Sequence, residues 1–170
     1  MPVRRSRWSC SQVACRADPR APVSPGTVNF SVTKSFVVHL AEGVRGDPKS
    51  LGEFTSLKAK GLLASGTVVI HGAAFGVSDF QQMGAGSKLI WSPRSNLVMY
   101  AQTTNVPLAL QEGVDVSLGV DWNPSGSDHI FDELRTAAEV NEEEFEGAIP
   151  ASDYPKQILR DFKDMDERFS

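Results

Sequence analysis

Between residues 34 and 140, short apolar runs alternate with longer segments of helical spacing. The runs are rich in β-branched residues, as buried strands are, and each is followed by a stretch with a helical period. The predicted strands span residues 36–40, 67–71, 88–91 and 114–119. The predicted helices span residues 48–63, 78–83, 106–111 and 128–139. Since apolar strands separated by helices are typical of a covered parallel sheet, the pattern predicts an α/β fold of four strand–helix units.

Beyond residue 140 the pattern changes. An acidic run covers residues 142–146 and Pro150 interrupts it. Residues 155–169 return to helical spacing with apolar side chains on one side, which is typical of an amphipathic packing helix. The chain therefore divides into a leader over 1–30, an α/β unit over 31–140, and an acidic linker with a terminal helix over 141–170.

The leader differs in charge from the rest of the chain. Residues 1–30 hold five arginines and one acid, whereas residues 31–170 carry a net charge of -8. This composition predicts a disordered leader, with an organelle-targeting peptide as the alternative. The whole chain of 170 residues has a net charge of -4, which argues against nucleic acid as a partner, because phosphate binding needs a basic excess. A small-molecule substrate is the expected partner.

Neither cysteine chemistry nor a membrane span is expected. The chain has two cysteines, both in the leader, and no second pair that could complete a four-cysteine zinc site or a disulfide framework. The longest uncharged stretch, residues 61–78, is interrupted by three glycines and a histidine, unlike a membrane-spanning helix. These features predict a cytoplasmic protein.

Polar residues close each predicted strand. They are His39, His71, residues 92–96 and Asp121. Taken singly, a histidine at a strand end is more often structural, and an aspartate is often a turn former. Taken together, they would converge, because functional side chains of parallel α/β folds collect at the carboxyl ends of the strands.

Two histidines and an aspartate at one mouth form a donor set that suits zinc or iron. Glu42 lies three residues after His39, close to this predicted metal site but not in its ligand set. It is the candidate proton carrier between water and a leaving group.

Four short motifs, in this order and spacing, resemble the carboxyl-terminal half of the amidohydrolase superfamily. The motifs are His39-Leu40-Ala41-Glu42, His71-Gly72, Ser92-Pro93-Arg94-Ser95-Asn96 and Leu118-Gly119-Val120-Asp121. The branch most similar to them contains the cytosine and guanine deaminases and the chlorohydrolases. The resemblance covers about residues 34–140, and its specificity lies in the ordered combination.

The resemblance implies strands five to eight of a TIM (β/α)8 barrel in which metal-activated water attacks an sp2 carbon. It implies His39 as a metal ligand and Glu42 as the proton shuttle. His71 would orient the water or reach the metal, and Asp121 would bind the metal and accept a proton. The implied substrate is a small molecule such as a heterocyclic amine, a chlorinated triazine or a cyclic amide.

The same resemblance assigns residues 92–96 to a motif that closes the seventh strand. Ser95 and Asn96 would shape the site, and Arg94 and Asn96 are candidate substrate contacts. His129 matches no family position, and we expect it to be a solvated residue near the start of the last predicted helix.

The chain departs from the family pattern in its first half. The family's His-x-His pair and its first four strands have no counterpart here. A half barrel would leave open edges, so we expect self-association or a need for a missing N-terminal half. The alternative function is a non-catalytic remnant, or half of a split enzyme, that acts through association. A non-haem iron oxygenase is a further alternative, although His39 and Glu42 are spaced one residue too far for its usual pair.

Overall fold

A computed structural model describes residues 35–150 apart from residues 65, 85, 86 and 123. The predicted leader over 1–30 and the predicted helix over 155–169 therefore lie outside the described residues.

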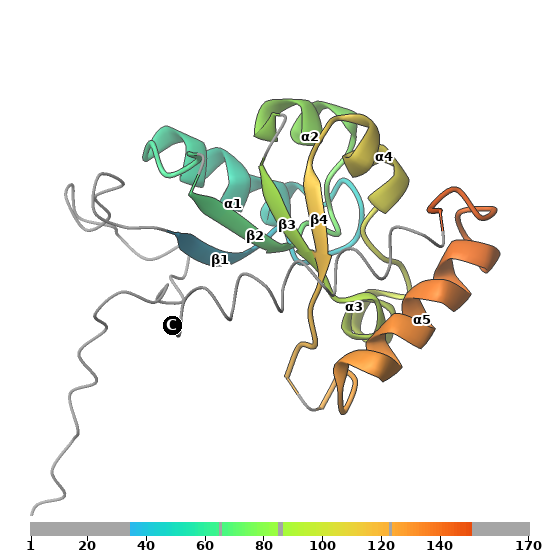
Figure 1. Cartoon of the computed structure of the whole chain (residues 1–170). Coiled ribbons are helices and arrows are strands. Elements are labelled where there is room, and N and C mark those ends of the chain that lie inside the picture. Colours follow the sequence, from blue (N-terminus) through green and yellow to red (C-terminus); the bar gives the residue numbers. More distant parts are fainter. Residues whose placement is uncertain (1–34, 65, 85–86, 123, 151–170) are drawn as a thin grey trace, which may run out of the picture.

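Four parallel strands form one sheet in the order β1-β2-β3-β4 (Figure 1). The strands are β1 (Phe36–Leu40), β2 (Thr67–His71), β3 (Lys88–Trp91) and β4 (Asp115–Leu118). The predicted α/β fold with four parallel strands is thus confirmed. The sheet is open in the described part of the chain, since β1 and β4 are its two edges. Its assignment to half of a barrel stays a prediction.

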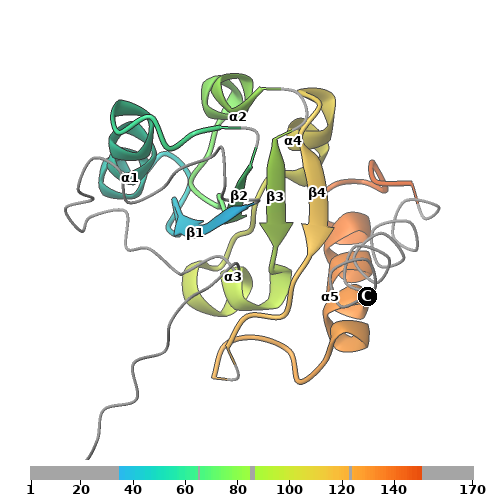
Figure 2. The same ribbon diagram turned by 60° about the vertical axis from the view of Figure 1, so that its left-hand side comes forward.

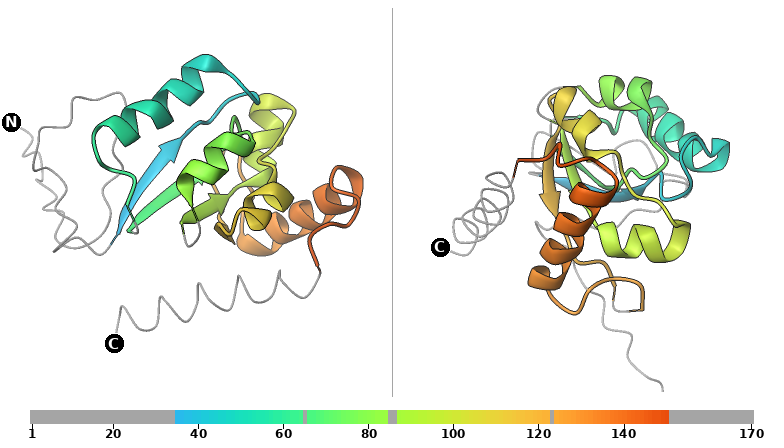
Figure 3. Two further views of the ribbon diagram at one scale, coloured as in Figure 1. Left: turned by 90° about the horizontal axis from the view of Figure 1, so that it is seen from above. Right: turned by 90° about the vertical axis from the view of Figure 1, so that its right-hand side faces the viewer.

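Within the described residues, five helices accompany the sheet. They are α1 (Pro48–Ala59), α2 (Val77–Met83), α3 (Pro93–Tyr100), α4 (Val106–Gln111) and α5 (Ile130–Glu143). Helices α1 and α5 lie at opposite ends of the sheet, beside β1 and β4 (Figures 1 and 3). Figure 2 shows the arrowheads of β3 and β4 directed toward α3, so this helix lies at the carboxyl ends of the strands.

The sequence pattern does not predict helix α3. It places residues 92–96 at the end of a strand, but the helix begins at Pro93 and includes most of that motif. Its buried side chains include the polar Ser95 and Asn96, while Val98 and Met99 are exposed. An amphipathic pattern cannot identify a helix whose buried positions are polar and whose exposed positions are apolar.

Helix bounds also differ from the predictions. The first helix ends at Ala59 instead of residue 63, because Gly61 adopts a left-handed φ of 66° that ends the helical path. The last described helix spans Ile130–Glu143 instead of 128–139. Helix α5 thus continues past residue 140, where the sequence predicts a domain boundary, and it includes Glu142 and Glu143.

The two faces of the sheet differ in burial. One lateral row is fully buried against the helices and consists of Val38, Val69, Leu89 and Val116. The next row lies on the other face and is only half-buried; it consists of His39, Ile70, Ile90 and Ser117. Since neighbouring residues of parallel strands share a face, His39 belongs to the less covered side of the sheet.

No helix within the described ranges is both long enough and apolar enough to cross a bilayer.

Candidate metal centre

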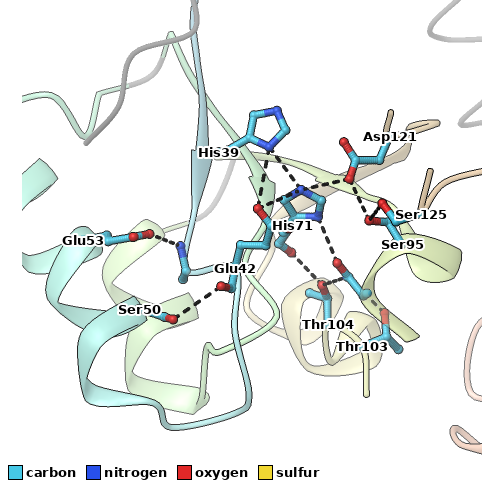
Figure 4. Close-up of polar contacts among 12 residues, drawn as sticks. His39, Glu42, Ser50, Glu53, His71, Ser95, Thr103, Thr104, Asp121 and Ser125 are labelled. Carbon is cyan, nitrogen blue, oxygen red and sulfur yellow. Dashed lines mark hydrogen bonds and ion pairs between the residues drawn. The ribbon is translucent and has the colours of Figure 1, made fainter. Parts of the chain in front are cut away.

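The carboxyl ends of β1, β2 and β4 bring four predicted residues together (Figure 4). His39 is in β1, Glu42 follows it, His71 ends β2, and Asp121 follows β4. This convergence follows from parallel topology, because equivalent strand ends lie at one edge of the sheet.

The two imidazoles face each other at hydrogen-bonding distance. His71 Nε2 lies 3.2 Å from His39 Nδ1. Glu42 Oε2 lies 3.6 Å from His71 Nε2 and 4.0 Å from His39 Nδ1. Donor atoms of these three residues all lie within 4.8 Å of one another, which is compact enough to surround one metal ion. Two nitrogens and one carboxylate oxygen suit zinc or iron.

Asp121 approaches the same histidine from β4. Its Oδ2 lies 3.8 Å from His71 Nε2 and accepts a 2.7 Å hydrogen bond from the Ser95 hydroxyl. The Ser95 hydroxyl is also 3.0 Å from the hydroxyl of Ser125. Gly126 packs so closely on Asp121 that a Cβ atom there would lie 2.8 Å from the Asp121 carbonyl oxygen. The loop after β4 thus folds back tightly against the Asp121 backbone, while Ser95 of α3 holds the carboxylate.

Side-chain exposure decreases toward the bottom of the site. The His39 and Glu42 side chains are 23% and 29% exposed, whereas Asp121 is 11% exposed and His71 is fully buried. A small solute can therefore reach His39 and Glu42 directly. His71 is held from behind by protein groups.

The backbone of His71 adopts an unfavourable conformation. Its φ of 74° lies in the left-handed region, which non-glycine residues rarely occupy. The Thr104 hydroxyl donates a 2.6 Å hydrogen bond to the His71 carbonyl and so holds this conformation. Backbone strain of this kind clusters at functional sites, where the surrounding structure maintains it.

The loop that carries Glu42 is fixed at both sides of this residue. Ala41 also has a left-handed φ, and its N–H donates to the Glu53 carboxylate of α1. Gly43 lies against Ser50, because a Cβ atom at Gly43 would come within 2.3 Å of the Ser50 hydroxyl oxygen. These contacts direct the chain from β1 back over α1 and leave the Glu42 carboxylate facing the histidines.

Tyr100 contacts the site without having been predicted. It lies near Glu42, and burial, together with that carboxylate's charge, raises the pKa of Tyr100. The phenol therefore stays protonated beside the Glu42 carboxylate. Tyr100 lies at the end of α3, the helix that the sequence pattern did not indicate.

Asn96 lies behind His71. Its side-chain oxygen is 2.9 Å from His71 Nδ1, and its amide nitrogen is 3.2 Å from the hydroxyls of Thr103 and Thr104. Asn96 is fully buried, so the structure gives it contacts with protein groups on both sides of the amide. The sequence motifs indicate Asn96 but neither threonine.

Arg94 and His129 lie apart from these contacts. Arg94 is exposed on the first turn of α3, and its backbone N–H donates to the buried Glu133 carboxylate. His129 is the N-cap of α5 and has a 60% exposed side chain, in agreement with the expected position near a helix start.

Comparison with known proteins gives one partial relative. The chain is 35% identical over 79 residues to a protein of Haloquadratum walsbyi named 5-methylthioadenosine/S-adenosylhomocysteine deaminase. The aligned part is 45% of this chain and 18% of that protein, so the match spans less than a fifth of the relative. No family model matches the chain. The relative is named a deaminase, a class of hydrolase that acts on carbon–nitrogen bonds.

Proposed function

We propose that this chain belongs by ancestry to the metal-dependent amidohydrolases and that its strand-end site hydrolyses a carbon–nitrogen bond. The observation that carries the proposal is the close approach of His39, Glu42 and His71, with Asp121 beside them. The partial similarity to a protein named a deaminase supports the same reaction class. The half-barrel assignment is part of this proposal, and the open four-stranded parallel sheet is compatible with it.

The metal ligands in this proposal are His39, His71 and Asp121. Glu42 belongs to the same compact group, but it is assigned the proton transfer because its side chain is the more exposed of the two carboxylates. The short distance between the two ring nitrogens fits a cation, because two nitrogen lone pairs 3.2 Å apart repel unless a proton or a cation lies between them. When bound, a divalent ion such as zinc or iron supplies a Lewis acid that lowers the pKa of water.

The acids divide the proton transfers between them. Asp121, held by Ser95, takes one proton from the attacking water and returns it to the product, and Glu42 carries the second proton from the new hydroxyl to the leaving nitrogen. The C–N bond breaks as the new C–O bond becomes a carbonyl, and ammonia leaves. Glu42 is suited to this transfer because its carboxylate faces both imidazoles while remaining partly open to solvent.

The proposed substrates are small heterocyclic amines. The name of the partial relative directs the first assays to 5-methylthioadenosine and S-adenosylhomocysteine. The full chain, loaded with zinc or iron, should release ammonia from such a substrate. Glu42→Gln should lower the rate by at least about 100-fold, the usual size of a general acid–base contribution, and should leave metal affinity within a few-fold.

The Glu42→Gln variant also separates the two roles open to this residue. A large loss of metal affinity would make Glu42 a ligand in place of a proton carrier. The matched variant Asp121→Asn should weaken metal binding instead. Absence of ammonia release by the metal-loaded wild type, across adenine nucleosides and other heterocyclic amines, would contradict the proposed activity of this chain.

The second candidate is a non-catalytic remnant, or half of a split enzyme, that acts through association. Both edges of the sheet are unpaired in the described part of the chain, and the face carrying His39 is only half covered. Open edges and uncovered apolar faces favour pairing with another chain. The candidate partners are a second copy or a separate N-terminal half.

Light scattering of the purified chain distinguishes the candidates. If the chain is a non-catalytic remnant, it should form a stable dimer without metal and have no hydrolytic activity. A monomer at high protein concentration would exclude self-association as the function of the isolated chain.

A further inference from the structure

A chain of buried hydrogen bonds runs behind His71, on the side away from Glu42 and Asp121 (Figure 4). His71, Asn96, Thr103 and Thr104 are each at most 1% exposed. Because a buried polar atom without a partner costs free energy, each donor in this hydrogen-bond network must face an acceptor. Only one assignment of the His71 ring proton meets this condition.

We propose that Thr104, acting through Asn96, fixes the neutral tautomer of His71 that carries its proton on Nδ1. The free lone pair is then on Nε2, the atom that faces His39, Glu42 and Asp121. This tautomer rests on the proposed function for its role in catalysis. A ring nitrogen must present a lone pair to bind a metal or to accept a proton from water. Asn96 and Thr104 are positioning residues.

The donor-to-acceptor direction of these hydrogen bonds is set by Thr104. Its hydroxyl has a single proton, which is donated to the His71 carbonyl at 2.6 Å. Toward Asn96, 3.2 Å away, Thr104 can therefore only accept. The group of Asn96 that faces Thr104 must be the NH2, so the amide oxygen faces His71 Nδ1 at 2.9 Å. An oxygen cannot donate, so the proton must be on Nδ1.

Thr103 lies equally close to the same amide but does not set its direction. Its hydroxyl oxygen is 3.2 Å from the Asn96 amide nitrogen and accepts a 2.7 Å hydrogen bond from the Trp91 indole. Accepting this bond leaves the Thr103 hydroxyl proton free to turn. The Thr103 hydroxyl could therefore donate to an amide oxygen as well as accept from an amide nitrogen. Thr103→Val is thus a matched control for Thr104→Val, with the same size, burial and distance.

The test is a long-range ¹H–¹⁵N correlation spectrum of the metal-free full chain labelled with ¹⁵N-histidine, recorded where the rings are neutral. The two tautomers have distinct nitrogen shifts and couplings. The His71 ring is identified as the one whose signals persist in both His39→Gln and His129→Gln. The wild type should show the Nδ1–H tautomer, and a dominant Nε2–H tautomer would overturn the proposal.

The variants test which residue sets the tautomer. Thr104→Val should lower the ratio of Nδ1–H to Nε2–H by about fivefold, the factor that one hydrogen bond of ordinary strength supplies. Thr104→Ser, which keeps the hydroxyl, should retain the wild-type ratio, as should Thr103→Val. An equal shift in both valine variants, or no shift in Thr104→Val, would assign the tautomer to something other than the direction of the Thr104 hydroxyl.

Failure of this proposal and failure of the proposed function are distinguishable. The tautomer is read from the metal-free protein and involves no change in charge, so it does not depend on hydrolysis. If the protein shows the Nδ1–H tautomer but releases no ammonia, the proposed function alone is contradicted. If it releases ammonia but shows the Nε2–H tautomer, the positioning role alone is contradicted.

Discussion

At the scale of single residues, each acid of the site is held by a different neighbour. Ser95 donates to Asp121, and Tyr100 lies near Glu42. Both residues belong to α3, so one helix supplies a neighbour to each of the two carboxylates that have different roles in the proposed reaction. Changing one neighbour at a time should therefore affect the two roles separately.

Ser95→Ala should lower the hydrolytic rate by about 10-fold or more, since partners of metal ligands usually contribute that much. The physical reason is the loss of the 2.7 Å hydrogen bond to Asp121 Oδ2. Ser125→Ala is the matched control, because Ser125 reaches this carboxylate only through the Ser95 hydroxyl and should have a smaller effect. Initial rates of ammonia release measure both, and equal losses would contradict a specific role for Ser95.

The Tyr100 hydroxyl should titrate above the ordinary tyrosine pKa of about 10. Burial raises the pKa of Tyr100 most, and the negative charge of Glu42 adds to this effect, because both disfavour a phenolate. Glu42→Gln removes the charge but not the burial, so the pKa should fall only part of the way back. Ultraviolet titration in a Tyr154→Phe background isolates Tyr100, and an unchanged pKa in Glu42→Gln would argue against contact between the two side chains.

Much of the site was predictable at this scale because strand ends are visible in the apolar pattern. His39, His71 and Asp121 were expected to converge from parallel topology alone, and they do lie together. Tyr100 and Thr104 carried no such signal. Their contacts depend on the path of α3 and the loop after it, which tertiary packing determines.

At the scale of elements, β3 and β4 approach each other closely beneath the site. A Cβ atom at Gly119 would lie 2.3 Å from Ile90 Cγ2, a distance that no side chain can tolerate without movement. Gly119 lies between the end of β4 and Asp121. Its close packing on Ile90 therefore helps to fix the backbone position from which the Asp121 side chain extends. In contrast, Gly52 within α1 has nothing within 4 Å of such a Cβ atom.

These two glycines predict opposite effects on stability. Gly119→Ala should lower the free energy of unfolding by about 1–3 kcal/mol, the usual cost of overpacking. Gly52→Ala should raise it by about 1 kcal/mol, because alanine is the better helix former at an exposed interior position. Urea unfolding of both variants measures the difference, and a neutral Gly119→Ala would contradict the close contact with Ile90.

The strands are easier to predict from the sequence than helix α3. The strands form continuous apolar runs, whereas α3 buries Ser95 and Asn96 and exposes Val98 and Met99. Its start does have a local signal, since Ser92 is the N-cap and Pro93 takes the first helical position. The buried Glu133 of α5 also accepts a hydrogen bond from the Arg94 N–H in this first turn, a contact across 39 residues that the sequence pattern does not indicate.

At the scale of the whole molecule, the described sheet is open at both edges and covered unevenly. His39 projects from the half-buried face, and the other site residues meet it at the carboxyl edge. The same arrangement supports a metal-dependent site and an interface with a second chain. Both proposals depend on what binds at that edge and face, so binding to the full chain is the property to measure.

Equilibrium dialysis of the full chain against zinc tests the central claim most directly. The wild type should bind about one zinc ion per chain, because three convergent ligands are enough for a catalytic-type site. The double variant His39→Asn, His71→Asn should lose this binding, and the single variant His129→Gln should retain it, since His129 lies at the exposed N-cap of α5. No zinc bound to the wild type, or equal binding by the double variant, would contradict a metal centre at the ends of β1 and β2.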